Sequence, residues 1–328
     1  MSEDMATMSR HRFLRPEDRE ILTGNATYGA DIHFDGLAFA VFVRSTHAHA
    51  RIAKLDIEKA EAAEGVLAVL TSRDFDHYGV ITHLAPFPNA DGTPVDAPGM
   101  RPLAGEVARY VGEPIVMIVA SSLDLARNAA ELVDITFEEL PFAVDARDAA
   151  GDQAPRADPS RASNIVATYE LGDRMAVDRV LAAGHKIVRL TVRNNRLVPA
   201  PIEPRVATAH YDAESGTFTL HAALQAAHLA RNHLADDFLR QPRDKLQVFV
   251  PRLGGGFGVR LPLYREEAAL LAATRLAGRP VRWKADRLEL FLSDYHARDH
   301  DSDIEAAFAP DGRILGLRTK VFVNLGAY

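Results

Sequence analysis

The chain has no cysteine among its 328 residues. It therefore forms no disulfide of its own and cannot bind zinc or an iron–sulfur cluster through thiolates. It also has no excess of positive charge, because 38 lysines and arginines stand against 45 aspartates and glutamates, a net charge of −7. Nucleic-acid binding requires a basic face that neutralises phosphates. The composition therefore predicts no nucleic-acid partner.

Long apolar runs are absent as well. No window approaches the ~18 apolar residues that a membrane helix requires. The first twenty residues are polar and charged, with no apolar centre, which is unlike a secretory signal. We therefore expect a cytoplasmic protein with no membrane partner.

The apolar runs that are present predict an α+β protein with two domains. Residues 1–15 are expected to form an N-terminal tail, and residues 16–145 a first α+β domain. Residues 146–164, "ARDAAGDQAPRADPSRASN", are polar and rich in Ala, Asp and Pro, which is typical of a linker. Residues 165–328 form a second, more strand-rich domain.

Runs of strand length, often rich in Val and Phe, predict most of the strands. They lie at 37–45, 50–57, 66–71, 114–121, 134–141, 164–171, 186–195, 205–212, 217–225, 245–252 and 280–286. Helical patterns lie at 122–133, 228–239 and 265–278. The last segment, 302–328, predicts a hairpin that turns at "PDGR". It ends on an apolar strand, so we expect either a partner that completes the domain or a truncated chain.

The stretch "PRLGGGFGVR", residues 251–260, lies where a predicted strand ends and a predicted helix begins. Glycine is used where backbone turns sharply or where another group approaches it closely. One interpretation is a tight turn and nothing more. A second is a phosphate-binding loop of a dinucleotide-binding protein. The spacing disfavours it, because a GxGxxG pattern that starts at Gly254 puts Val259 at the final glycine, and no GK[ST] lysine follows.

A third interpretation uses more of the chain. "GGGFG" resembles the signature of the large, molybdenum-binding subunit of the molybdenum hydroxylases, the family of xanthine dehydrogenase, aldehyde oxidase and aerobic carbon monoxide dehydrogenase. Other segments resemble family segments in the family's order, from residue 14 to residue 328. They are "LTGNATYGADI" (22–32), "VRSTHAHARI" (43–52), "PLAGEVARYVGEPIVMIVA" (102–120), "NNRLVPAPIEPRVATAHYD" (194–212), "LQAAH" (224–228), "RPVRW" (279–283) and "NLGAY" (324–328). The resemblance implies an α/β hammerhead domain followed by the first part of a mixed α/β molybdenum-cofactor-binding domain.

The resemblance also implies which residues meet the cofactor. Gly255, Gly256 and Gly258 would let backbone amides approach the molybdenum centre, and Phe257 would give it an apolar wall. Gln225, 32 positions before Phe257, would donate a hydrogen bond to an oxo group on the metal without adding charge. No side chain of this chain would ligate the metal directly. The alternatives are a core aromatic for Phe257 and a surface or helix-capping glutamine for Gln225.

Other polar residues have simpler interpretations. His47 and His49 share a strand face, but no third metal ligand is in view, and we expect a structural role for both. His228 would lie near Gln225 if a helix begins there. "IEPR" suggests a buried ion pair between Glu203 and Arg205. The run "DYHARDHDSD" (294–303) predicts an ion-paired or solvated face.

Two departures from the family pattern limit the function. The purine-oxidising members carry Gly-Lys-Glu after the loop, and the glutamate binds the substrate, whereas this chain has Val259, Arg260 and Leu261. Leu261, near the substrate position, cannot accept a hydrogen bond from a purine. The family's catalytic glutamate base belongs to a second cofactor domain that would follow Tyr328, so no catalytic residue is assigned here.

The implied protein is part of an oxidoreductase that hydroxylates an aldehyde, an N-heterocycle or carbon monoxide with oxygen from water. Its cofactor is a molybdopterin-type molybdenum cofactor in the cytosine dinucleotide form. The implied partners are an iron–sulfur subunit, an FAD subunit and a chain that carries the second molybdenum domain. The alternative from another class is a non-catalytic or truncated half-subunit.

Overall fold

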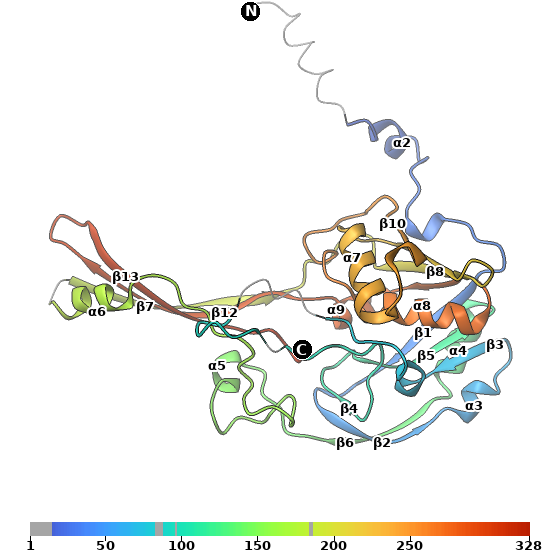
Figure 1. Ribbon diagram of the computed structural model, residues 1–328, viewed down its shortest axis with the longest axis horizontal. Coiled ribbons are helices and arrows are strands. Elements are labelled where there is room, and N and C mark those ends of the chain that lie inside the picture. Colours follow the sequence, from blue (N-terminus) through green and yellow to red (C-terminus); the bar gives the residue numbers. More distant parts are fainter. Residues whose placement is uncertain (1–14, 83–87, 96, 184–185) are drawn as a thin grey trace, which may run out of the picture.

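The structure is a computed structural model that describes residues 15–82, 88–95, 97–183 and 186–328. At its centre lies a seven-stranded mixed sheet (Figure 1). The strand order is β10-β9-β8-β11-β1-β5-β3. The strands are β1 (Ala38–Arg44), β3 (Val66–Leu70), β5 (Pro114–Ala120), β8 (Val206–Asp212), β9 (Thr217–Ala222), β10 (Leu246–Phe249) and β11 (Val281–Lys284). All but Arg15 of the predicted tail, residues 1–15, lies outside the described residues.

This sheet joins the two halves of the chain. Strand β1 pairs in parallel with β11, with Ala38 opposite Val281 and Ala40 opposite Trp283. Strands on both sides of the polar segment 146–164 therefore share one sheet. The mixture of helices and mixed sheets confirms the α+β class. The domain boundaries at 145 and 165 stay a prediction.

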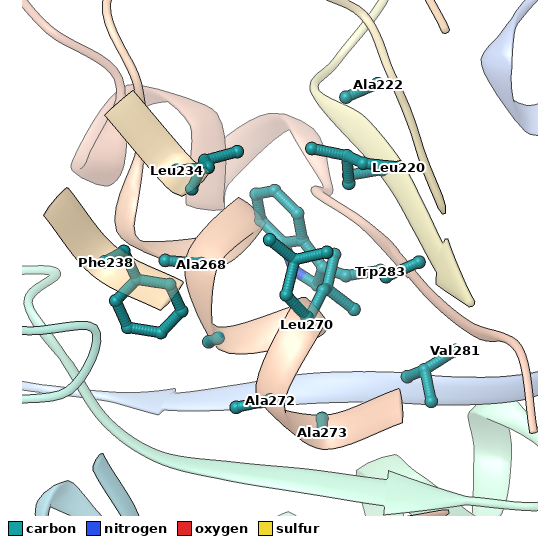
Figure 2. Close-up of a cluster of buried hydrophobic side chains, with 14 of the residues drawn as sticks. Leu220, Ala222, Leu234, Phe238, Ala268, Leu270, Ala272, Ala273, Val281 and Trp283 are labelled. Atoms are coloured by element: carbon teal, nitrogen blue, oxygen red, sulfur yellow. The ribbon is translucent and has the colours of Figure 1, made fainter. Parts of the chain in front are cut away.

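Helix α8 (Arg265–Ala277) packs its alanine and leucine face on the central sheet (Figure 2). Ala268 and Leu270 are fully buried against Trp283, which is 2% exposed. The helix forms here because its sequence consists of good helix formers. Glu267 accepts a hydrogen bond from the Tyr264 N–H at the start, and Gly278, with φ 62°, ends the helix.

A second sheet, of three strands, is formed by the first half of the chain. Its order is β4-β2-β6, and its strands are β2 (Ala50–Asp56), β4 (Val107–Ala108) and β6 (Asp134–Glu139). The helices α3 (Glu58–Glu61) and α4 (Leu123–Ala130) belong to the same half. A second buried cluster, with Ile115, Ile118 and Ala126 at its centre, packs between them.

The third sheet projects from the body as an arm, at the left of Figure 1. It contains β7 (Lys186–Leu197), β12 (Ala297–Phe308) and β13 (Ile314–Val323), in the order β13-β12-β7. Strands β12 and β13 form the predicted hairpin. The predicted strand at 164–171 is wrong, and helix α6 (Arg174–Ala182), which the sequence analysis missed, follows it instead. Within the predicted linker, α5 (Ala146–Ala149) is helical.

The predicted helix at 228–239 forms in two parts, α7 (Ala227–His233) and a π-helix, η3 (Leu234–Leu239). Gly79 lies so close to η3 that a Cβ there would meet the Asp237 carbonyl oxygen at 1.7 Å. The remaining helices are α2 (Asp18–Leu22), η1 (Gly29–Asp31), η2 (Ser72–Phe75), η4 (Arg243–Lys245) and α9 (Arg287–Ser293). None of the helices in the described ranges has the length and apolar character needed to cross a bilayer.

The arm has two chemically different faces, because side chains alternate along a strand. One face carries ion pairs such as Arg189–Glu305 and Arg193–Asp301. The other is apolar and open to solvent. Its exposed residues are Val188, Leu190, Val192, Leu317, Val321 and Val323, at 39–58% exposure.

An exposed apolar face of this kind promotes association. We expect the isolated chain to bind a hydrophobic dye and to self-associate. The double substitution Leu190→Thr and Val321→Thr should reduce both, because threonine keeps β-propensity but removes apolar area. Dye fluorescence and light scattering measure the effect, with Thr319→Ser on the same face as control. A wild-type chain that is monomeric and binds no dye would contradict the prediction.

Candidate functional site

The glycine loop, residues 254–258, connects β10 to the segment that leads into α8. Three of its residues have left-handed backbone: Gly255 with φ 119°, Phe257 with φ 49° and Gly258 with φ 82°. Phe257 is the exception among them, because positive φ is uncommon outside glycine and costs free energy. A non-glycine residue held in this conformation is a feature that clusters at functional sites.

Gln225 lies directly against the loop, although it is 29 positions before Gly254 in the sequence. Its Oε1 atom accepts hydrogen bonds from the N–H of Gly258 at 2.9 Å and of Arg260 at 3.2 Å. The backbone N–H of Gln225 donates to the Arg260 carbonyl oxygen at 2.9 Å. Because the amide oxygen is occupied, the Nε2 group is the free end of the side chain, and it donates to no described residue. The structure thus brings Gln225 and the loop together, while its role toward a cofactor stays a prediction.

Gly256 makes room for that glutamine. A Cβ at residue 256 would lie 2.7 Å from Gln225 Cδ and 2.9 Å from its Oε1. The sequence analysis predicted that residue 256 is glycine so that a cofactor can approach the backbone. The position of the Gln225 side chain already requires a glycine here.

Three consecutive backbone donors remain available in the loop. The N–H groups of Gly255, Gly256 and Phe257 donate to no other described residue, whereas Gly254 N–H is bonded to Glu203. Together with Gln225 Nε2 they form a set of uncharged donors. Such a set fits a ligand that is rich in hydrogen-bond acceptors.

Apolar side chains border these donors. Phe257 is 74% exposed, so it is not a core aromatic, and Leu261 is 46% exposed. The ideal Cβ position of Gly255 lies 3.1 Å from both Phe257 Cε2 and Pro201 Cβ, which puts the phenyl ring beside Pro201. This arrangement offers an apolar surface next to the free N–H groups.

His47 and His49 do not join this site, and the placement of His228 near Gln225 stays a prediction. His49 is 6% exposed and its Nδ1 lies 2.8 Å from the Pro141 carbonyl oxygen, while the His47 ring packs on Phe137 at 4.5 Å. His228 is exposed in the first turn of α7. Along β12, Asp299, Asp301 and Asp303 are ion-paired with arginines, as predicted for that run. No cluster of three metal-binding side chains occurs among the residues described.

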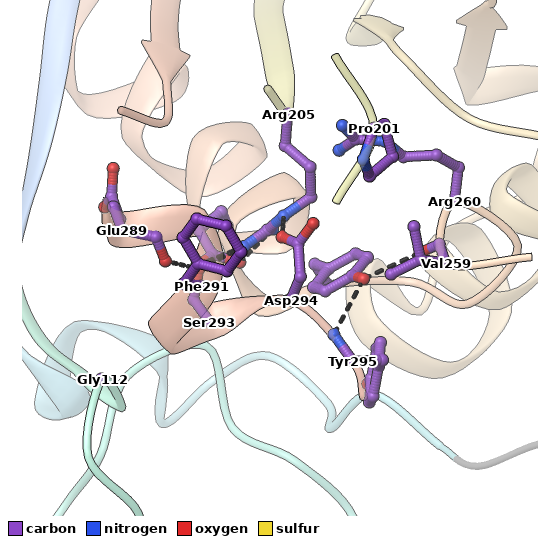
Figure 3. Close-up of polar contacts among 12 residues, drawn as sticks. Gly112, Pro201, Arg205, Val259, Arg260, Glu289, Phe291, Ser293, Asp294 and Tyr295 are labelled. Atoms are coloured by element: carbon purple, nitrogen blue, oxygen red, sulfur yellow. Dashed lines mark hydrogen bonds and ion pairs between the residues drawn. The ribbon is translucent and has the colours of Figure 1, made fainter. Parts of the chain in front are cut away.

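The predicted ion pair between Glu203 and Arg205 is wrong. Arg205, 2% exposed, points to other carboxylates: its Nη1 lies 2.8 Å from Glu266 and its Nε 2.5 Å from Asp294 (Figure 3). Its guanidinium also lies 3.8 Å from the Tyr264 ring centroid. Glu203 turns instead to the glycine loop, because Gly254 N–H donates to its Oε2 at 2.7 Å.

Arg205 belongs to a buried network at the start of α8. Glu266 also accepts from Arg44 of β1 at 2.6 Å, and Arg44 lies 2.7 Å from Glu289. Burial alone would raise the pKa of Glu266, but Arg205 and Arg44 hold it at about 2. The next residue, Glu267, forms no ion pair with an arginine among the described residues, and burial raises its pKa to about 7.

A large cavity among the described residues lies elsewhere. It has a volume of about 1430 Å³ and opens between segment 142–177, strand β13 and Tyr328. No residue of the glycine loop lines it. The loop is the better candidate site, because it combines strained backbone, unpaired donors and an apolar border.

Comparison with known proteins identifies these features. The molybdopterin cofactor-binding domain profile matches residues 157–328, more than half of the chain. The profile of the aldehyde oxidase and xanthine dehydrogenase a/b hammerhead domain matches residues 23–141. The chain belongs to the molybdenum hydroxylase family.

Curated relatives and solved structures agree. The chain is 32% identical over 326 residues to the carbon monoxide dehydrogenase large chain of Afipia carboxidovorans, covering 96% of this chain and 39% of that one. It is 34% identical to the nicotine 6-hydroxylase large subunit of Paenarthrobacter nicotinovorans, covering 97% and 38%. The structure of quinoline 2-oxidoreductase from Pseudomonas putida 86 superimposes with a TM-score of 0.84 and 34% identity, over 94% of this chain and 38% of that one.

The chain thus spans about two fifths of these relatives. A nicotinate dehydrogenase large molybdopterin subunit from Eubacterium barkeri differs in this respect. It is 29% identical over 330 residues, which cover all of this chain and 73% of that subunit. The matched part of a molybdenum hydroxylase large subunit is its hammerhead domain and a cofactor-binding domain, as the sequence predicted.

The raised pKa of Glu267 makes stability depend on pH. Between pH 4.5 and 7 the unfolded chain has lost this proton and the folded chain retains it, so the free energy of unfolding falls as pH rises through that window. Glu267→Gln keeps an oxygen for the Tyr264 N–H and removes the titration. Relative to the exposed control Glu214→Gln, we expect it to recover about 2–3 kcal/mol of the loss between pH 5 and pH 8. Urea unfolding at both pH values measures this, and an unchanged pH dependence would refute it.

The contact between residue 256 and Gln225 predicts a local effect of Gly256→Ala. The flexible glutamine can move away, so the free energy of unfolding should change by less than about 1 kcal/mol. The displaced amide would lose its bonds to Gly258 and Arg260, whose N–H groups should exchange with solvent faster. The effect should vanish in a Gln225→Ala background, because the colliding side chain is gone. Gly105→Ala, where a Cβ would have at least 3.7 Å of space, is the control. Equal effects of Gly256→Ala in both backgrounds would contradict the assignment.

Proposed function

We propose that this chain forms the N-terminal part of the molybdenum-binding subunit of an oxidoreductase that hydroxylates a small molecule with oxygen from water. The observation that carries the proposal is the donor set formed by Gln225 Nε2 and the three N–H groups of the glycine loop that have no partner among the described residues. Oxo and sulfido ligands accept hydrogen bonds, so this uncharged donor set fits the molybdenum cofactor that the family implies. The apolar border fits a site from which water is excluded.

The cofactor, when bound, supplies the two-electron chemistry. Gln225 would donate from Nε2 to an acceptor on it without competing as a metal ligand. Gly255, Gly256 and Gly258 would let the backbone approach, and Phe257 would cover the reacting centre on one side. Because these donors are already fixed by protein contacts, binding would require little reorganisation.

An aldehyde, an N-heterocycle or carbon monoxide is the proposed substrate class. Leu261 has no polar atom with which to bind a purine. Relatives named for nicotine, quinoline and carbon monoxide support this range. The base that activates water is proposed to lie outside this chain, in a second cofactor domain.

Partners are part of the proposal. With no cysteine in the chain, electrons would leave through an iron–sulfur subunit and an FAD subunit. A second molybdenum domain would complete the cofactor site, either on the same polypeptide or on a partner chain. We propose the cytosine dinucleotide form of the cofactor and a cytoplasmic location.

The competing function is a half-subunit that binds partners but no cofactor. Metal analysis of the purified complex separates the two. Molybdenum near one atom per complex supports the enzyme, and its absence supports the non-catalytic subunit. A dinucleotide-binding protein is disfavoured, because the glycine loop falls inside the matched cofactor domain.

Gln225→Ala tests the role of the amide in the assembled complex. Loss of one donor to a reacting centre typically lowers turnover by about 10²–10³. We expect a loss of that order, with molybdenum content and thermal unfolding close to wild type. Gln247→Ala, a change of the same residue type on an exposed position of β10, is the control. An unchanged turnover number would remove Gln225 from the site.

A further inference from the structure

The segment 200–203 runs beside the glycine loop and is joined to it by two hydrogen bonds between Glu203 and Gly254. Glu203 N–H donates to the Gly254 carbonyl at 3.2 Å, and Gly254 N–H donates to Glu203 Oε2 at 2.7 Å. The approach is close, since a Cβ on Gly254 would lie 2.5 Å from Glu203 Cβ. The backbone of this segment is also strained, because Ala200 has φ 43°.

Two arginines hold the same segment from the other side through its carbonyl groups. Arg287, at the start of α9, donates from Nη1 to the Pro201 carbonyl at 2.7 Å and from Nη2 to the Ile202 carbonyl. Arg260, 1% exposed, donates from Nη2 to the Glu203 carbonyl at 2.6 Å. Three successive carbonyls therefore accept from guanidinium groups, which form stronger hydrogen bonds than neutral donors.

The carboxylate of Glu203 is not arranged for maximal stability. Its Oε2 binds Gly254, but its Oε1 is buried and has no hydrogen-bond partner among the described residues. A buried oxygen without a partner costs free energy. An apolar side chain would avoid this cost, so the stability of the fold does not by itself account for a carboxyl acceptor at the first glycine of the loop.

We propose that Glu203 is a positioning residue for the glycine loop. Its carboxylate fixes Gly254, while Arg260 and Arg287 fix Glu203. Gln225 fixes the other end of the loop, so the three residues between are held with N–H groups that donate to no described residue. The consequence for a bound cofactor rests on the proposed function, but the positioning itself is a property of this chain.

The first test uses the chain alone. Glu203→Ala removes the acceptor, whereas Glu203→Gln keeps one amide oxygen for Gly254 N–H, and the exposed Glu214→Ala is the matched control. The hydrogen-bonded amides of this region are those of Gly254, Gly258, Val259 and Arg260. Hydrogen exchange should show them exchanging at least about tenfold faster in Glu203→Ala, and near the wild-type rate in the other two. A factor of ten corresponds to about 1.4 kcal/mol of local opening free energy. Amides of α8 and the central sheet should keep their wild-type rates.

The second test uses the complex assembled with its partners. Glu203→Ala should lower molybdenum content several-fold and reduce kcat more than it raises KM, and Glu203→Gln should restore both. If Glu203→Ala does not fold, the decisive pair becomes Glu203→Gln and Arg287→Met. The first should then keep the wild-type loop exchange, and the second should accelerate it.

Wild-type exchange of the loop in Glu203→Ala would overturn the proposal, and so would equal exchange and molybdenum content in the Ala and Gln variants. A wild-type complex without molybdenum would instead overturn the proposed function. The exchange rates of the isolated chain would still decide the role of Glu203.

Discussion

The buried contact between Arg205 and Glu266 is the interaction on which the rest of the structure depends. Glu266 accepts from Arg205, which precedes β8, and from Arg44 of β1, so one carboxylate joins both halves of the chain. Taking these charges out of water is costly, and only their mutual contacts compensate for it. Removing one partner would leave an unpaired buried charge. The network therefore makes the two halves fold together around one sheet.

The same network sets the position of the site. Glu266 lies in the first turn of α8, a few residues after the glycine loop. Tyr264, whose ring contacts Arg205, donates its hydroxyl to the Val259 carbonyl at 2.7 Å and accepts from the Tyr295 N–H at 3.1 Å. The end of the loop is thus tied to a network of buried charges. Its beginning is tied to Glu203, so the loop has little freedom at either end.

The sequence predicted features that depend on neighbouring residues better than contacts between residues far apart in the chain. Most of the strands, helix α8 and the β12–β13 hairpin follow from local patterns, and the family resemblance pointed to both Gln225 and the loop. Arg205 was paired with Glu203 because the two are neighbours in sequence, whereas its true partners are 61 and 89 residues away. The strand predicted at 164–171 failed because alternation alone cannot supply a neighbouring strand to pair with. Local periodicity specifies elements, but the partners of buried charges follow from the tertiary fold.

The N–H groups of Gly255, Gly256 and Phe257 have no partner among the described residues. Protein contacts on either side of them, rather than a ligand, hold the backbone in this arrangement. Gly254 N–H is taken by Glu203, and those of Gly258 and Arg260 by Gln225. The backbone between these anchors includes positive φ at Gly255 and at Phe257, and no described residue is available there to accept the remaining N–H groups. A donor set held in this way keeps its geometry before any ligand arrives, which is the condition under which hydrogen bonds contribute most to binding and catalysis. The strain at Phe257 and the buried oxygen of Glu203, which has no partner among the described residues, are costs to the fold. The proposed role of the loop, to present three backbone donors to a cofactor, would account for both.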